Sequence, residues 1–204
     1  MRKLVFLIGL LLNGAVLLAQ TTTINTDSTV KQASKLPGSS LKKTEGAAML
    51  ATNNIITNIS ASPELSNFYK VIKATGLSET LTSQGPITVF APNNQAFNNL
   101  TSGKLDTLLT PQRKYDLIAM ITYHTLAGKV TSRDIVHQIN TNKGLATFTT
   151  ITGSKLMARL DTNRNIVLID EHGGESVISR FDLEQSNGMI HIITGVLVPK
   201  FKTI

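Results

Sequence analysis

The sequence of 204 residues contains no cysteine and no tryptophan, and aromatic residues make up only 5% of it. Without cysteine the protein has no disulfide bond, no thiol nucleophile and no thiolate metal ligand, so an exported domain must be held together by its core alone. We therefore also expect no lipid anchor on an N-terminal cysteine. The scarcity of aromatic residues leaves little material for a large aromatic-lined pocket.

Long apolar runs are scarce too, and the one that stands out lies in the first 19 residues. Arg2 and Lys3 precede apolar stretches at residues 4–12 and 15–19. A short basic start followed by an apolar core is the pattern of a signal peptide. The run is interrupted at Asn13 and falls short of the roughly 20 residues that span a bilayer. We expect residues 1–19 to be a signal peptide, with an uncleaved membrane anchor as the alternative.

The rest of the chain contains no segment apolar enough to cross a membrane. The formal net charge is +7, and removal of Arg2 and Lys3 with the signal would lower it to +5. A nucleic-acid-binding protein concentrates more basic residues on one face. We therefore expect no nucleic-acid partner and no membrane span after signal removal. The expected location is outside the cell, in the periplasm or in the cell envelope.

Threonine, serine, lysine and asparagine dominate residues 20–53, with Pro37–Ser40 in the middle. Apolar residues there are sparse and follow no period, which is typical of a flexible spacer. We expect residues 20–53 to be a polar linker. Residues 54–204 then form one domain, a length that suits a single core.

Helical patterns come first in this domain. Ser62 and the proline after it offer a capping hydroxyl and a favourable first helical position. Apolar residues follow at helical spacing, and Gly76 is suited to end the helix. A second helix is predicted from Thr110 to about Tyr123, and Asn93-Asn94 is expected to cap a short helix.

Patterns with a period of two, typical of half-buried strands, dominate after Gly144. They predict strands at residues 145–151, 154–160, 166–170, 175–183 and 189–197, with a tight hairpin at Thr152-Gly153 and one early strand at residues 87–91. Early helices followed by antiparallel strands indicate an α+β fold rather than a doubly wound one.

Three stretches of the domain stand out together. They are Gly85–Phe97 (GPITVFAPNNQAF), Thr122–Val130 (TYHTLAGKV) and Ser186–Ile193 (SNGMIHII), the last followed by Val196–Pro199. In this order and spacing they closely resemble the three motifs of the fasciclin (FAS1) domain family, which have the forms TVFAP, YH and NGxIHxI. The resemblance extends from about Asn54 to Pro199. It departs from the family at Ala127, where proline is frequent, and at Thr194, where aspartate is common.

The resemblance implies a β-sandwich-like wedge of mainly antiparallel strands with several packed α-helices. It also implies adhesion, with a protein or a polysaccharide as the partner. In some animal members of the family the first motif and the YH motif are linked to receptor contact, so the candidate partner-binding residues are Tyr123, His124, Asn93 and Asn94. The alternative for Tyr123 and His124 is packing, because a helix end favours histidine and a tyrosine can bury its ring. His191 is expected to be a hydrogen-bonded structural residue.

Catalytic and metal-binding patterns find little support. The four histidines contain no pair at metal-ligand spacing, and no G-x-S-x-G nucleophile elbow occurs. Asp170, Glu171 and His172 resemble a catalytic cluster, but two glycines follow them, so we expect them to cap a strand in a polar loop. We predict a protein that is not an enzyme and uses no metal or cofactor.

Two hypotheses for function follow. The first is a secreted or cell-envelope adhesion module that binds protein or glycan partners. The alternative is a carrier of a small apolar ligand, a lipid or pigment, in a groove lined by residues such as Phe90, Phe97 or Phe148. Asn58 and Asn99 also fit the N-glycosylation sequon, which matters only in a host that glycosylates asparagine.

Overall fold

The structure, a computed structural model, describes residues 49–83, 85–100 and 104–200. These residues belong to one unit, Lys43–Ile204. The expected signal peptide, residues 1–19, and the expected linker up to residue 48 lie outside the described residues. No helix within the described ranges combines the length and the apolarity that crossing a membrane requires.

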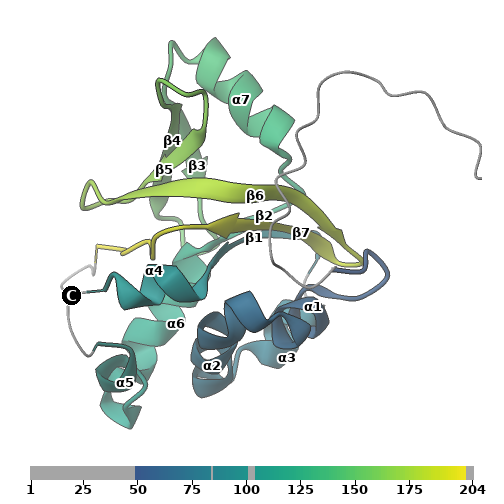
Figure 1. Cartoon of the computed structure of the whole chain (residues 1–204), viewed down its shortest axis with the longest axis vertical. Coiled ribbons are helices and arrows are strands. Elements are labelled where there is room, and N and C mark those ends of the chain that lie inside the picture. Colours follow the sequence, from purple (N-terminus) through teal and green to yellow (C-terminus); the bar gives the residue numbers. More distant parts are fainter. Residues whose placement is uncertain (1–48, 84, 101–103, 201–204) are drawn as a thin grey trace, which may run out of the picture. The chain divides into compact units, whose positions relative to one another are not determined.

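Along the chain, the first two strands divide the helices into three groups, which are labelled in Figure 1. Before the first strand lie α1 (Ile55–Ala61), the 3₁₀ turn η1 (Pro63–Leu65), α2 (Ser66–Thr75) and α3 (Ser78–Ser83). Between the first and second strands lie α4 (Asn94–Asn98), α5 (Lys104–Leu108), the 3₁₀ turn η2 (Pro111–Arg113) and α6 (Lys114–Tyr123), and α7 (Ser132–Thr141) follows the second strand.

Gly76 and Asn93 act at helix ends as the sequence predicts. Gly76 ends α2 in the left-handed conformation, with φ at 79°, which a residue without a Cβ adopts at little cost. The Oδ1 atom of Asn93 accepts a hydrogen bond from the N–H of Ala96 at 2.8 Å and so caps α4. The prediction that Ser62 caps this helix is wrong, because its side chain makes no capping hydrogen bond. A 3₁₀ turn intervenes, and α2 begins only at Ser66.

The strands form one sheet. They are β1 (Ile87–Pro92), β2 (Thr125–Ala127), β3 (Ala146–Thr149), β4 (Lys155–Leu160), β5 (Ile166–Ile169), β6 (Glu175–Gln185) and β7 (Gly188–Ile193). Their order is β2-β1-β7-β6-β5-β4-β3, and β1 runs parallel to β7 while the other neighbours are antiparallel. This arrangement confirms the predicted α+β fold with mainly antiparallel strands. The short β2 is an addition to the strands that the sequence predicts.

The two edges of this sheet meet at one end. Leu126 in β2 forms an antiparallel bridge with Thr150, just after β3. The N–H of Ile151 also donates to the carbonyl of Thr125 at 3.0 Å. The sheet therefore curves back on itself, as the wedge implied by the family resemblance requires.

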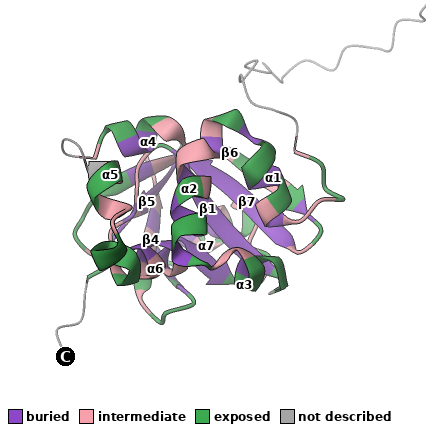
Figure 2. Cartoon of the chain, turned by 90° about the horizontal axis from the view of Figure 1, so that it is seen from below, coloured by how far each residue is buried: buried purple, intermediate pink, exposed green. Residues whose placement is uncertain are grey.

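β1 and β7 are buried on both faces along their whole length. One hydrophobic cluster joins α1, α2 and α6 to the sheet through residues such as Val89 and Ile190. A second cluster joins α7 to β3, β4 and β5, and it includes Phe90 and Ile193. Neighbouring residues of β1 enter different clusters because side chains alternate across a strand. Figure 2 shows these buried strands behind helices that expose their outer faces.

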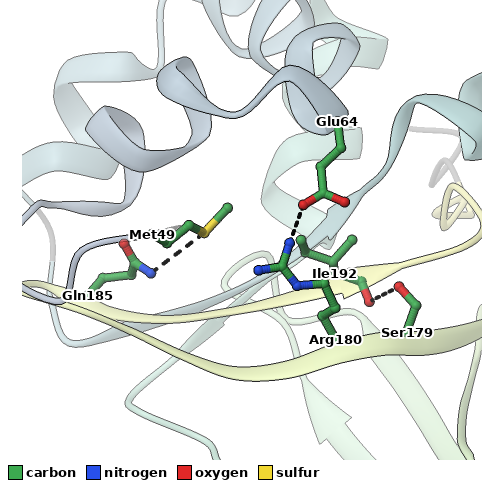
Figure 3. A network of polar contacts seen from close by, with 6 residues as sticks. All are labelled: Met49, Glu64, Ser179, Arg180, Gln185 and Ile192. Carbon is green, nitrogen blue, oxygen red and sulfur yellow. Dashed lines mark hydrogen bonds and ion pairs between the residues drawn. The ribbon is translucent and has the colours of Figure 1, made fainter. Parts of the chain in front are cut away.

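Residues 49–53 fall in the expected linker, yet they contact the domain. The N–H of Leu50 donates to Oδ1 of Asn58 at 3.2 Å, and its carbonyl accepts from Nδ2 of Asn58 at 2.8 Å. The Nε2 atom of Gln185 lies 3.9 Å from the sulfur of Met49 (Figure 3). Asn58 is only 3% exposed, so this sequon asparagine lies inside the fold.

Candidate functional site

Tyr123 ends α6 and is fully buried. Its hydroxyl donates to the carbonyl of Lys155 at 2.8 Å and accepts from the N–H of Glu171 at 3.1 Å. Burial raises the pKa of Tyr123 well above its ordinary value, because the phenolate would lose its hydration. The hydroxyl therefore joins α6 to the start of β4 and to the turn between β5 and β6.

His124 is also fully buried, one residue beyond α6. Its Nδ1 atom lies 2.8 Å from the carbonyl oxygen of Met120, so this nitrogen carries the proton, and Nε2 accepts from the N–H of Leu197 at 3.1 Å. Burial lowers the pKa of His124 to about 4, which keeps the ring neutral. The burial of Tyr123 and His124 agrees with a packing role, and a direct partner contact would require either side chain to leave the interior.

Asn93 and Asn94 follow β1 and are half-buried. Asn93 caps its own helix, whereas Asn94 reaches back to an earlier one. The Oδ1 atom of Asn94 accepts from the N–H of Asn67 at 3.0 Å, and its Nδ2 atom donates to the carbonyl of Pro63 at 2.8 Å. Asn94 therefore accepts a hydrogen bond from the first turn of α2, the role that the sequence predicts for Ser62. Both amide groups have internal partners.

His191 lies in the middle of β7 and is fully buried. Its Nε2 atom donates to the carbonyl of Val130 at 2.9 Å, and its Nδ1 atom accepts from the N–H of Asp182 at 3.2 Å. The ring stacks on Phe90 with centroids 5.5 Å apart. Burial lowers the pKa of His191. The predicted role as a hydrogen-bonded structural histidine is confirmed.

Asn187 and Gly188 lie at the turn between β6 and β7. The Oδ1 atom of Asn187 accepts from the N–H of Ile55 at 3.0 Å, and its Nδ2 atom donates to the carbonyl of Leu81 at 2.8 Å. The turn is thereby tied to α1 and α3. A Cβ atom on Gly188 would lie 1.9 Å from the carbonyl oxygen of Ile87, so only glycine fits between β7 and β1.

The cluster at Asp170, Glu171 and His172 serves the backbone, as predicted. The Oδ1 atom of Asp170 accepts from the N–H groups of His172 and Gly174 at 2.9 and 2.7 Å, and Oδ2 accepts from the N–H of Val198 at 3.0 Å. Glu171 accepts from the backbone of Lys155 and Lys200. The contact with residue 198 is a link that sequence reasoning missed. Within the described residues, no group of three or more His, Asp or Glu side chains is placed to hold a metal ion.

Glu64 and Arg180 form a second link that sequence reasoning missed (Figure 3). The guanidinium of Arg180 in β6 pairs with the carboxylate of Glu64 in η1, and the two side chains are only 18% and 19% exposed. Beside them, the hydroxyl of Ser179 donates to the carbonyl of Ile192 at 3.1 Å. No local pattern could reveal this pair, because its residues are 116 positions apart.

The outer surface carries several large apolar side chains. Tyr115 is 82% exposed, Phe181 57% and Ile151 45%. An apolar hollow of about 250 Å³ is lined by Thr80, Leu81, Ile87, Thr125 and Ile151. The phenylalanines expected beside a groove pack elsewhere, since Phe90, Phe97 and Phe148 lie in the two hydrophobic clusters.

Comparison with known proteins gives consistent results. The family model for the fasciclin domain matches residues 63–199. Protein sll1483 of Synechocystis sp. is 32% identical over 165 residues, covering 78% of this chain and 84% of that protein. Periostin of Homo sapiens is 29% identical over 141 residues, which cover 69% of this chain and 15% of periostin. This chain therefore spans only a small part of that longer relative.

Among solved structures, the FAS1 domain pair of the insect cell adhesion molecule Fasciclin I matches with a TM-score of 0.63 at 20% identity. The match covers 72% of this chain and 51% of that chain. At this identity the likeness supports the fold alone. The family match, which spans well over half of the chain, carries the assignment. The chain belongs to the fasciclin domain family.

Proposed function

We propose that this protein is an adhesion module of the cell envelope or the extracellular space that binds a protein or a glycan on a surface. Membership of the fasciclin domain family supports this proposal. The solved FAS1 pair with the same fold comes from a protein described as a cell adhesion molecule. A location outside the cytoplasm rests on the apolar start of the sequence, residues 1–19.

The observation that carries the proposal is the distribution of side chains between the interior and the surface of the domain. The reactive-looking side chains, such as those of His124, Asp170 and His191, all have backbone partners in the interior. Large apolar side chains such as Tyr115 and Phe181 face water instead. Exposed aromatic residues are frequent anchors of protein interfaces. A binding role therefore fits this distribution better than catalysis does.

In this proposal Tyr123, His124, Asn93 and Asn94 act on partner binding through the elements that they join. Asn94 positions α2 relative to β1, and His124 positions the segment at Leu197 relative to α6. A change at any of them would alter binding together with stability. A change at an exposed side chain that contacts the partner would alter binding alone.

The test is capture from envelope and cell-surface extracts with the tagged full chain, followed by mass spectrometry of the bound protein and glycan. We expect the same partner in repeated captures, displaced by an excess of untagged chain and absent with heat-unfolded chain. Capture that untagged chain does not displace would contradict the proposal.

A second candidate function, carriage of a small apolar ligand, is favoured by the hollow of about 250 Å³ at Leu81, Ile87 and Ile151. Ile151 is partly exposed at this hollow, so Ile151→Arg would block it without disturbing the core. Native mass spectrometry of gently purified full chain is the test. A carrier would show a bound mass that the I151R variant lacks, and an empty wild-type chain would rule this function out.

A further inference from the structure

The surface between α7 and β6 carries an exposed phenylalanine beside a hollow with an apolar floor and a polar rim. The hollow has a volume of about 180 Å³. Its lining combines the apolar Val136 of α7, Ile166 of β5 and Ile178 of β6 with the polar Ser132 and Asn165. Ile166 and Ile178 are 7% and 6% exposed, whereas Phe181, which also lines the hollow, is 57% exposed. Aromatic side chains beside an apolar depression are typical of protein-binding surfaces.

Phe181 is held outside by the irregular course of β6. The register of β6 against β7 shifts twice between Ile178 and Leu183. Asp182 adopts a left-handed φ of 57° there, a conformation that is costly for a residue with a Cβ. Its carboxylate offsets this cost by accepting hydrogen bonds from the hydroxyl of Ser132 and, at 2.7 Å, from its N–H. The exposure of Phe181 is therefore supported by the contact between Asp182 of β6 and Ser132 of α7.

Arg164 contributes a positive charge to the lining of the same hollow. Across the described ranges of the chain, its guanidinium makes no ion pair and no hydrogen bond. The nearby carboxylates have other partners. Asp161 accepts from the N–H groups of Asn163 and Asn165 at 2.8 and 2.7 Å, and Asp182 accepts from the N–H of Ser132 at 2.7 Å. The planar guanidinium is thus available to a carboxylate from outside.

We propose that this hollow binds one apolar side chain of a protein partner in which an Asp or Glu stands next to that side chain, and that Arg164 pairs with the carboxylate. The proposal rests on the adhesion function and adds the surface and the chemistry of the partner. A dry cavity of about 150 Å³ holds one benzene molecule. A hollow of about 180 Å³ therefore suits a single Leu, Ile, Met or Phe side chain.

The direct test is an NMR titration of the full chain with the capped dipeptide N-acetyl-Leu-Glu-amide as the probe. We expect saturable shifts of the methyl signals of Val136, Ile166 and Ile178, smaller at high salt. The neutral analogue N-acetyl-Leu-Gln-amide should bind about two- to fivefold more weakly, as expected for loss of an exposed ion pair. N-acetyl-Ala-Glu-amide should bind about tenfold more weakly, because it buries less apolar surface.

Three variants test whether the probes bind at this hollow. Arg164→Gln should remove the difference between the charged and the neutral probe. Phe181→Ala should weaken both by about tenfold, because the side chain that covers the bound group is lost. Tyr115→Ala is the matched control, since it removes an aromatic side chain that is 82% exposed elsewhere, and it should change neither affinity.

The proposal is overturned if the dipeptide leaves the three methyl signals unshifted up to its solubility limit, or if the neutral probe binds as tightly as the charged one. The adhesion function would survive that result if the full chain still captures a partner and Phe181→Ala leaves the capture unchanged. Conversely, saturable probe binding at the hollow with no captured partner would support the site and contradict the adhesion function.

Discussion

The Nε2 atom of His124 accepts a hydrogen bond from the N–H of Leu197 at 3.1 Å, which joins the YH motif to the closing motif inside the domain. This bond requires a neutral ring, because a protonated imidazole has no acceptor nitrogen. The pKa of His124 is lowered from 6.5 to about 4 by burial. Protonation and folding are therefore linked at this residue.

Stability should fall as the pH drops from about 6.5 towards 4. In that range the unfolded chain binds a proton at His124 that the folded chain does not, so the stabilisation present above pH 6.5 is lost progressively. The pKa difference corresponds to roughly 3 kcal/mol. Urea unfolding at about pH 7 and about pH 4.5 measures this loss. The His124→Gln variant, which cannot titrate, should show a smaller pH dependence; equal slopes in both proteins would contradict the assignment.

Tyr123→Phe removes the hydroxyl that bridges the carbonyl of Lys155 and the N–H of Glu171. Two backbone groups lose their partner, so we expect a loss of about 1–3 kcal/mol in the free energy of unfolding. Tyr115→Phe is the control, because Tyr115 is 82% exposed, and it should change stability by less than about 0.5 kcal/mol. Equal stability of Tyr123→Phe and wild type would show that the hydroxyl does not hold these elements together.

Gly188→Ala in the closing motif should strongly lower the stability of the domain. The added Cβ would lie 1.9 Å from the carbonyl oxygen of Ile87, so β7 and β1 would have to separate, at a cost above about 3 kcal/mol. Gly153→Ala is the matched control: its φ is 80°, but no atom lies within 4 Å of the new Cβ. That variant should lose only about 1–2 kcal/mol. Thermal unfolding of both variants measures these losses of stability. Comparable losses in the two variants would contradict a steric clash at Gly188.

The ion pair between Glu64 and Arg180 should stabilise the domain more than an exposed pair does. A double-mutant cycle with Glu64→Gln and Arg180→Met is expected to give a coupling energy of about 1–2 kcal/mol, because both side chains are mostly buried. The pair Lys129–Glu184 has side chains that are 41% and 60% exposed, and the same cycle there should give less than about 1 kcal/mol. Equal couplings would show that partial burial adds nothing to the first pair.

Local patterns were sufficient to predict much of this fold. The left-handed end at Gly76, the cap at Asn93 and the hairpin at Thr152 depend on neighbours within a few positions, which the sequence displays directly. The period of two likewise predicted the late strands. The prediction for Ser62 failed because a cap also depends on where the helix starts. Here a 3₁₀ turn delays that start to Ser66.

The contacts that join distant elements were beyond the reach of local patterns. Asn94 caps a helix 27 residues earlier in the chain, and Asn187 accepts from a backbone group 132 residues away. The hollow beside Phe181 likewise assembles from three separate elements. Periodicity reports which face of an element is buried, but it does not report which element lies against it.

The measurement that tests the account most directly is saturation binding of the labelled full chain to intact cells and envelope fragments, with and without an excess of unlabelled chain. We expect saturable, displaceable binding. Among variants that stay folded, that binding should weaken with Phe181→Ala and persist in Tyr123→Phe once it is expressed per folded molecule. Binding that never saturates, or that falls with Tyr123→Phe and not with Phe181→Ala, would contradict the claim that this domain recognises its partner through its outer surface.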